Sequence, residues 1–333
     1  MAYASRHLSY ILGSVGFSLQ VFAGCWDEYS HLLFGKVDTG WNPARLTLYF
    51  GTGLVILAIW RGFQKSRARP VFPTTIRFTN TSGLKIAGLG AIIQILAGGW
   101  NEITHHLFLS EPQIAPAHVL LTFGMLIVGF GMVLGLSIEN GMIRHDILIV
   151  ADWKRWLIFI CMILTFASIW LAAYGSLIYI ASGVHGSIVT WLVAALLAGV
   201  ATLVLVPAKR TLPDFGSATL IGVVFNCVGF ALQVSYGRAP VYFPWGLVPL
   251  LLFDVLVLLG KRVVAFEKAV LFSSTVPSFL FYATYYPFTQ QLLPWASSFG
   301  SPVLILFVGG FTGACLGNRI YSTLSSFLLN SVT

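Results

Sequence analysis

Charged side chains are scarce in this chain. Asp, Glu, Lys and Arg make up 9% of the 333 residues, whereas hydrophobic side chains make up 57% and the mean hydropathy is +0.85. Soluble domains carry about a quarter charged residues, so the composition excludes an ordinary soluble protein. It indicates an all-α, polytopic membrane protein, because helices satisfy their own backbone hydrogen bonds in lipid.

Several motifs of catalysis are also missing. The sequence has no Walker loop, no G-x-G-x-x-G after a strand, no G-x-S-x-G elbow and no H-E-x-x-H pair. Their absence removes the nucleotide-binding, hydrolase and zinc-protease interpretations that these patterns support. The four cysteines show no C-x-x-C spacing, so no disulfide framework is expected. Cys25, beside Trp26, is expected to be a small buried residue rather than a metal ligand.

Long apolar runs are what the sequence has in abundance. A run of about 20 residues crosses the roughly 30 Å hydrocarbon core as a helix. Ten such runs predict about ten transmembrane helices. They fall at about 7–25, 45–61, 83–100, 118–137, 156–181, 187–206, 216–235, 242–260, 264–285 and 299–317.

Basic residues are distributed unevenly between the two sides of these runs. With the N-terminus inside, only Lys36, Arg45 and Arg238 of the 19 Lys and Arg residues fall in outer segments, and the other 16 fall in inner ones. Inner loops of membrane proteins are enriched in Lys and Arg. We therefore expect a multi-pass protein of the plasma membrane with both termini cytoplasmic. The net charge of +8 is then topological, and no nucleic-acid partner is expected.

The segment after the first apolar run is duplicated. Residues 20–34 read QVFAGCWDEYSHLLF and residues 94–108 read QILAGGWNEITHHLF, at an offset of 74. The second copy then lacks one residue, and the match resumes at the following prolines. The shared positions are Gln20/Gln94, Ala23/Ala97, Gly24/Gly98, Trp26/Trp100, Glu28/Glu102, His31/His105, Leu33/Leu107 and Phe34/Phe108, then Pro43/Pro116, Ala44/Ala117, Leu48/Leu121, Phe50/Phe123 and Gly51/Gly124.

This duplication divides the sequence into two halves. Residues 1–154 form a four-helix half with copies at about 16–55 and 90–128, each read as a helix, an outer turn and a helix. Residues 155–333 form a six-helix half without the W-x-E-x-x-H pattern. Because both copies enter from the inside, they are expected to be a parallel repeat related by an axis along the membrane normal. Both histidine-bearing turns then face the extracytoplasmic side.

Each copy keeps a carboxylate close before a histidine. Glu28 stands three residues before His31, and Glu102 stands three residues before His105. Asp27, four residues before His31, shares the same helical face. Imidazole and carboxylate donors suit copper, zinc or iron, and facing E-x-x-H pairs hold metals in di-metal helical bundles. The pattern therefore predicts a metal site.

A further histidine distinguishes the second copy. His118 follows Pro116 at the start of the next run, where a closed hairpin would bring it over His105. The first copy has Arg45 at this position, which supplies no lone pair for a metal. The two copies are therefore not equivalent, and the second is the better metal site. Whether they form one site or two stays open.

The same residues support other interpretations. Trp, His and Asn at the ends of membrane helices often form an interfacial belt with their polar tips among the headgroups, so the duplicated segment can simply end two helices. A proton relay or a substrate-binding role is a further alternative. His185, in the segment SGVHGS, is expected to be an ordinary loop histidine.

The spacing Asn101-x3-His105-x12-His118 resembles the Asp-x3-His-x12-His copper motif in the C subunit of the copper-dependent membrane monooxygenases that oxidise methane and ammonia. The resemblance covers about 20 of 333 residues. It implies that His105 and His118 are imidazole ligands of copper, with Asn101 at the carboxylate position or Glu102 in its place. Ten helices exceed those of that subunit, which implies a relative or a partner. W-D-x-x-x-H followed by a proline–histidine pair also resembles uncharacterised prokaryotic membrane proteins.

Polar residues inside the apolar runs are candidates for other roles. Asp254 lies within the eighth run, where a buried acid marks either an ion pair or a proton path. Gln20 and Gln94 are expected to hydrogen-bond across helices, or else to orient a ligand. The cations near Asp254 in the sequence are Lys261, Arg262 and Lys268.

Three functions follow from these patterns. The leading one is a membrane protein with an outward-facing His/carboxylate site for metal, copper before zinc or iron, as a subunit or relative of a membrane oxidoreductase. The second is a transporter with a pathway between the repeat units and past Asp254. The third is a structural subunit of a larger membrane complex. Each has lipid as a partner, and the first and third also have other membrane subunits.

The charge asymmetry generates a topology prediction. A reporter fused after Thr333 should be cytoplasmic, and one inserted near Asp38 should be external, because 16 of the 19 basic residues fall on one side. Protease accessibility in sealed vesicles measures both positions. A cytoplasmic Asp38 would invert the topology and place the histidines in a reducing compartment.

Overall fold

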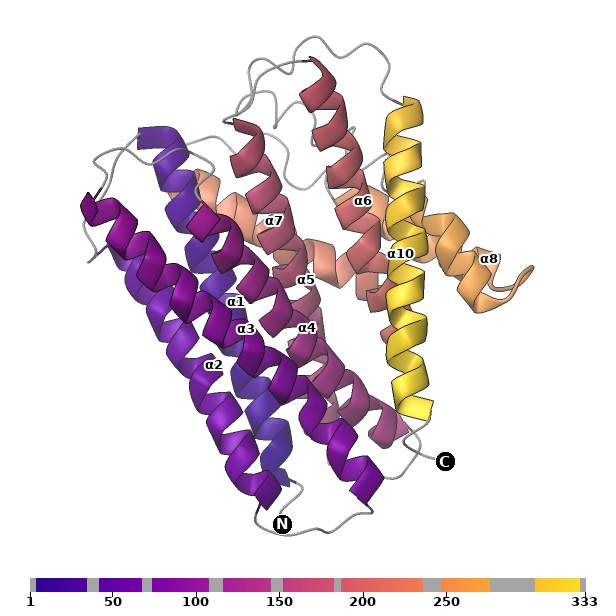
Figure 1. Cartoon of the computed structure of the whole chain (residues 1–333). Helices are drawn as coiled ribbons and strands as arrows, with labels where there is room; N and C mark the ends of the chain where they lie inside the picture. The colour runs from indigo at the N-terminus through magenta and orange to yellow at the C-terminus, as the bar shows by residue number, and fades with distance from the viewer. Residues whose placement is uncertain are drawn as a thin grey trace. The chain divides into compact units, whose positions relative to one another are not determined.

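The computed structural model describes residues 4–34, 42–67, 74–107, 116–144, 152–182, 187–235, 247–275 and 303–329, and most of these are helical (Figure 1). Its helices are α1 (Ala4–Phe34), α2 (Pro43–Arg67), α3 (Thr74–Leu107), α4 (Pro116–Arg144), α5 (Asp152–Ser182), α6 (Ser187–Thr211), α7 (Ser217–Ser235), α8 (Val248–Gly260) and α10 (Val303–Leu329). Residues 266–275, between α8 and α10, are also helical. These residues include no strand, which confirms the predicted all-α class for them.

Each predicted apolar run overlaps a described helix, but not every helix is long enough to span a bilayer. Among the residues that the structure describes, six helices, within α1 to α6, are long and apolar enough to cross a membrane. Their length and composition are consistent with a multi-pass membrane protein. α8 has 13 residues, about 20 Å at 1.5 Å per residue, which is shorter than the hydrocarbon core. Spans beyond these six stay a prediction.

Proline marks the first residue of two helices. Pro43 begins α2 and Pro116 begins α4, positions where the missing N–H of proline costs no hydrogen bond. Before Pro43, the Oδ1 atom of Asn42 accepts a 3.0 Å hydrogen bond from the backbone N–H of Ala44. This side chain satisfies a donor that the first turn of α2 leaves open.

The duplicated motif lies within helices and not in turns. α1 continues to Phe34 and α3 continues to Leu107, so residues 26–31 and 100–105 occupy the last turns of these helices. The turn predicted from their polarity is wrong, because a 34-residue helix such as α3 extends about 51 Å and its polar end can project beyond the hydrocarbon core. The helical spacing assumed for both E-x-x-H pairs is present in the backbone.

The chain divides into two compact units. Unit 1 comprises Met1–Ala172 with Leu324–Thr333, and unit 2 comprises Ala173–Thr323. Unit 1 contains both copies of the duplicated segment. In it, α1 with α2 and α3 with α4 form antiparallel hairpins, and α1 and α3 run in the same direction (Figure 1).

Each hairpin closes through a pair of glycines. A Cβ atom on Gly16 would lie 2.8 Å from the carbonyl oxygen of Gly51, and one on Gly90 would lie 2.6 Å from that of Gly124. The two pairs occupy corresponding positions of the copies. Lipid gives apolar helices little hydrophobic reason to associate, so small residues that let backbones approach supply the packing. The two hairpins are therefore closed by the same contact.

Contacts between the two hairpins are reciprocal. Tyr10 of α1 packs on Gly135 of α4, and Leu84 of α3 packs on Gly62 of α2. Tyr10 corresponds to Leu84, and Gly62 corresponds to Gly135. The first helix of each hairpin thus contacts the second helix of the other through residues that correspond in the sequence duplication.

In unit 2, α6 and α10 also approach through small residues. A Cβ atom on Gly199 of α6 would lie 3.1 Å from the Gly309 carbonyl oxygen of α10. Thr202 Oγ1 donates a 2.8 Å hydrogen bond to the carbonyl oxygen of Gly310, a polar contact typical of membrane helix pairs. The glycines of α10 that face α6 are spaced four residues apart: Gly309, Gly313 and Gly317.

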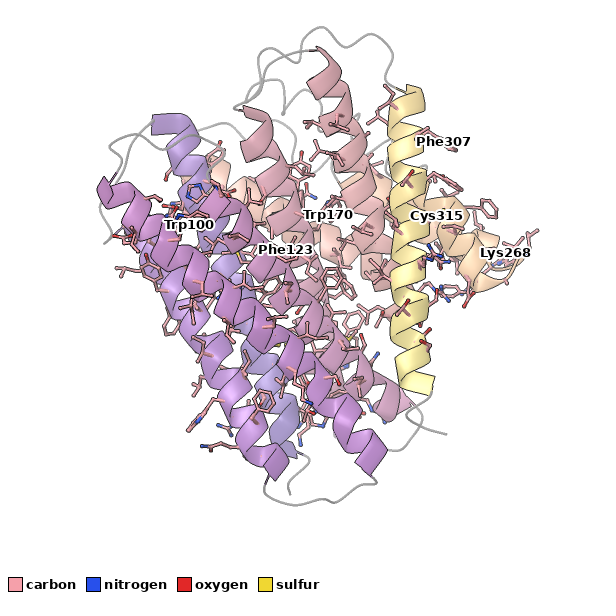
Figure 2. All side chains as sticks on the ribbon, viewed as in Figure 1. Trp100, Phe123, Trp170, Lys268, Phe307 and Cys315 are labelled. Atoms are coloured by element: carbon pink, nitrogen blue, oxygen red, sulfur yellow. The ribbon has the colours of Figure 1, made fainter. Side chains whose placement is uncertain are left out.

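Large apolar side chains remain exposed on unit 1. Trp100 is 45% exposed and Phe123 is 55% exposed, whereas Trp170 is fully buried (Figure 2). An apolar surface of this kind is unfavourable in water and is what a lipid-facing helix requires. The bilayer is therefore a partner of this surface.

The glycine contacts generate a stability prediction. Gly90→Ala should lower the free energy of unfolding by about 1–3 kcal/mol, because the methyl group would overlap backbone atoms of α4. Gly53→Ala is the matched control: a Cβ atom there has nothing within 4 Å, and alanine favours the helix by up to about 1 kcal/mol. Thermal unfolding of both variants in nanodiscs measures the difference. Equal midpoints would contradict close packing at Gly90.

Candidate functional site

In the first copy, a polar cluster around Asp27 joins α1 to α2. Arg45 Nε lies 3.6 Å from Asp27 Oδ2, and Asn42 Nδ2 donates a 3.2 Å hydrogen bond to Asp27 Oδ1. The two charged side chains are only 12% and 20% exposed. A cation and an amide therefore occupy the two oxygens of this carboxylate. Arg45 serves as the counter-charge of Asp27.

Neutral side chains stand at the corresponding positions of the second copy. Asn101 of α3 corresponds to Asp27, and His118 of α4 corresponds to Arg45. Both are half-buried. Asn101 Oδ1 is buried and accepts no hydrogen bond from any residue that the structure describes. The charged pair of the first copy is thus replaced by an amide and an imidazole, which both carry lone pairs.

The remaining predicted ligands are placed unequally. Glu28 is half-buried, whereas Glu102 is exposed. The backbones of His31 and His105 are helical, and their side chains lie outside the described part of the chain, as does His185. Among the side chains that are described, no group of three or more His, Cys, Asp or Glu is placed to hold a metal ion.

The donors that are described in the second copy fit a metal in their chemistry. Imidazole is a ligand for copper, zinc and iron, and a buried oxygen without a hydrogen bond, such as Asn101 Oδ1, calls for an explanation such as an ion or water. An amide oxygen is neutral and donates less strongly than a carboxylate. The fit of this site to a metal therefore depends on histidine nitrogens. Of the two predicted histidine ligands, His118 is the one whose side chain the structure describes.

The two matched glutamines are both buried, but only one has a partner. Gln20 Nε2 donates a 2.8 Å hydrogen bond to Thr52 Oγ1 of α2, which confirms the predicted cross-helix bond in the first copy. Met125 takes the place of Thr52 in the second copy. The amide of Gln94 makes no hydrogen bond to the residues described, so the prediction is wrong there, because the partner hydroxyl is lost.

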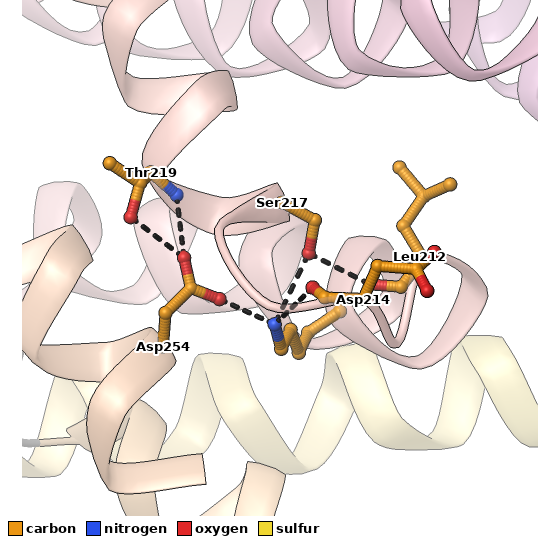
Figure 3. Close-up of polar contacts among 6 residues, drawn as sticks. Leu212, Asp214, Ser217, Thr219 and Asp254 are labelled. Carbon is orange, nitrogen blue, oxygen red and sulfur yellow. Dashed lines mark hydrogen bonds and ion pairs between the residues drawn. The ribbon is translucent and has the colours of Figure 1, made fainter. Parts of the chain in front are cut away.

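A buried ion pair lies in unit 2, between α6 and α8 (Figure 3). Lys209 Nζ contacts Asp254 Oδ1, and it also donates to the Asp214 carbonyl oxygen at 2.8 Å and to Ser217 Oγ at 3.3 Å. Asp254 Oδ2 accepts hydrogen bonds from the N–H and hydroxyl of Thr219 at 2.9 and 2.7 Å. Both ions are thus paired and hydrogen-bonded, as burial of charge requires.

This pair corrects the partner expected for Asp254. The sequence-near cations Lys261, Arg262 and Lys268 are all exposed. Lys209 lies 45 residues away in the sequence but is brought to Asp254 by the packing of unit 2. The predicted structural ion pair is therefore confirmed, and its predicted partner is wrong, because proximity along the chain does not determine contacts between helices.

A second buried ionisable pair was not predicted. His7 of α1 contacts Glu139 of α4 through Nδ1 and Oε2. The two residues are 4% and 0% exposed. Ionisable residues at membrane depth are costly and mark functional sites by default. His7 is the first residue of the first apolar run and Glu139 follows the fourth run by two residues, so the signal in the sequence was an ionisable side chain at the edge of a run and not inside one.

The ion pair of unit 2 generates a stability prediction. Lys209→Met should cost about 3–5 kcal/mol, because it leaves the buried Asp254 charge unpaired. Adding Asp254→Leu should recover most of the loss. Lys261→Met is the control and should be neutral, since Lys261 is exposed. Thermal unfolding of the three variants measures this, and a double variant as unstable as the single one would contradict direct pairing.

Comparison with family models, with curated proteins and with solved structures finds no match for this chain. The function is therefore argued from the residues themselves.

Proposed function

We propose that this protein binds a transition metal ion, copper before zinc or iron, at the extracytoplasmic end of the α3–α4 hairpin. His105 and His118 would supply the imidazole ligands. Such a site makes the chain a subunit or relative of a membrane oxidoreductase. The observation that carries the proposal is the replacement of the Asp27–Arg45 ion pair by neutral lone-pair donors at the corresponding positions of the second hairpin.

Equivalence of the two hairpins supports this placement. The Gly16–Gly51 contact of the first hairpin is matched by Gly90–Gly124 in the second, so the helix ends beyond these contacts should be spaced alike. Positions that meet as an ion pair in one hairpin should then face each other in the other. This puts Asn101 opposite His118 across the α3–α4 contact.

The helical register supports His105 as the next ligand. His105 follows Asn101 by four residues in α3, which places both on one face, about 6 Å apart along the axis. Glu102 is exposed, about 100° around the helix from Asn101. It can contribute an oxygen only from the rim of the site, so Asn101 is the inner oxygen donor.

The two copies would then have different tasks. In the first copy, Glu28 and His31 remain as possible ligands, but both Asp27 oxygens are engaged by Arg45 and Asn42. The guanidinium would also repel a cation. We therefore assign metal binding to the second copy and the closing of the α1–α2 hairpin to the first. Copper would supply one-electron chemistry, and the chain would hold the ion and shield it from water.

A transporter is the second candidate, and the buried ionisable pairs favour it. The side chains of His7–Glu139 in unit 1 and Lys209–Asp254 in unit 2 are buried, and buried ionisable residues mark ion or substrate pathways in membrane proteins. Its pathway would run between the two repeat units. Metal content separates the two functions, because transport through these pairs requires no bound copper.

Removal of single histidines tests the metal assignment. His105→Ala and His118→Ala should each weaken copper binding by 10-fold or more, since each removes a nitrogen ligand. His31→Ala should have a smaller effect, because Arg45 repels a cation in the first copy. Elemental analysis and copper titration of the purified protein measure occupancy and affinity. Equal losses from His31 and His105 would instead indicate one shared site bridged by Glu28 and Glu102.

Occupancy should also depend on pH. Imidazole binds a metal only when it is neutral, and its unperturbed pKa is about 6.5, so copper should be lost as the pH falls below about 6. The helical circular dichroism signal should persist, because the fold rests on internal backbone bonding. Protein that holds no copper, zinc or iron at pH 7.5, and whose unfolding midpoint does not respond to added copper, would contradict the metal assignment.

A further inference from the structure

The His7–Glu139 pair lies at the end of unit 1 where α1 begins and α4 ends. This end is opposite to the proposed metal site, and the distribution of basic residues predicts it to be cytoplasmic. The pair joins α1 to α4 through Nδ1 and Oε2. Both side chains are more than nine-tenths buried.

The bonding of Glu139 differs from that of Asp254. Asp254 receives two hydrogen bonds from Thr219 in addition to Lys209. Within the described residues, the Glu139 carboxylate has only its contact with His7, and its Oε1 accepts no hydrogen bond. A buried carboxylate oxygen without a donor is costly as an anion and is satisfied by a proton. Both oxygens of Asp254 therefore have hydrogen-bond donors, whereas Oε1 of Glu139 lacks one.

The pair is also absent from the repeat. The positions that correspond to His7 and Glu139 are Thr81 and Ser66, which cannot exchange protons at physiological pH. The reciprocal packing of Tyr10 on Gly135 and Leu84 on Gly62 is nevertheless present on both sides. The contact between hairpins thus forms without an ionisable pair. Packing alone gives no reason for the two titratable groups.

The charged side chains described at this end of unit 1 are mostly positive. On the helices that pack against α1 and α4, the charged residues described at this end are Arg61 and Lys65 of α2, Lys85 of α3, and Asp152, Lys154 and Arg155 of α5. Lys154 interacts electrostatically with His7. A cation that acts on the pair, as Lys154 does, lowers the energy of a net negative charge on it.

We propose that His7 and Glu139 form a proton-exchange site at the inner end of unit 1. The pair holds one proton between Nδ1 and Oε2, as imidazolium with carboxylate or as imidazole with carboxylic acid, with zero net charge in either form. Release of that proton to the inner side leaves imidazole with carboxylate and one negative charge. Uptake reverses this step. The site serves a proton-consuming reductive reaction or proton-coupled transport, and it does not depend on the metal assignment.

Infrared difference spectroscopy of the full-length protein in lipid tests the proposal. Between about pH 4 and pH 9, wild-type protein should show a carboxylic-acid C=O band that shifts in D2O and decreases as the pH rises. The band should be lost in Glu139→Gln. It should persist to higher pH in His7→Gln, because the carboxyl group then lacks the base that takes its proton. Asp254→Asn is the matched control and should leave the band unchanged.

Two outcomes would overturn the proposal. One is wild-type protein without any exchangeable carboxylic-acid band that changes over this pH range, since the pair would then be a permanent ion pair. The other is a titrating band that survives Glu139→Gln. The wild-type spectrum needs no variant to fold, and helical circular dichroism of the variants verifies their structure. The readout is independent of copper content, so a failure here and a failure of the metal assignment are distinguishable.

Discussion

Close backbone contact between helices is the constraint on which unit 1 depends. In lipid, apolar helices gain little hydrophobic free energy by packing together, so their association depends on close van der Waals contact. The Gly16–Gly51 and Gly90–Gly124 contacts provide that fit. They fix the spacing and register of each hairpin, and thereby which side chains face each other at the helix ends. The polar pairs beyond the glycines are consequences of this packing.

The two hairpins show that the same scaffold can carry different chemistry. Equivalent glycines close both of them, yet the first keeps an Asp27–Arg45 ion pair and the second has Asn101 and His118. The first hairpin is charged and internally satisfied. The second has an oxygen without a hydrogen bond and a lone-pair donor on the facing helix. A duplication that keeps its packing residues can change its polar ends independently, which explains why we assign function to one copy.

The sequence was sufficient for the features that depend on local composition and spacing. Hydropathy located the helices, and the offset of 74 residues identified the corresponding hairpins. It was insufficient where helices distant in the chain meet. Helix packing brings Lys209 to Asp254 and His7 to Glu139. Proximity in the sequence therefore gave the wrong partner for Asp254 and no partner for His7.

The central claim is that neutral donors at the positions of Asn101 and His118 make the second hairpin the metal site. The direct test is the copper content of the double variant Asn101→Asp with His118→Arg, which gives the second hairpin the ion pair of the first. Mass spectrometry of metals should find copper in the wild type and almost none in the variant, while the unfolding midpoint without copper stays within a few degrees. Unchanged copper content in a folded double variant would contradict the account.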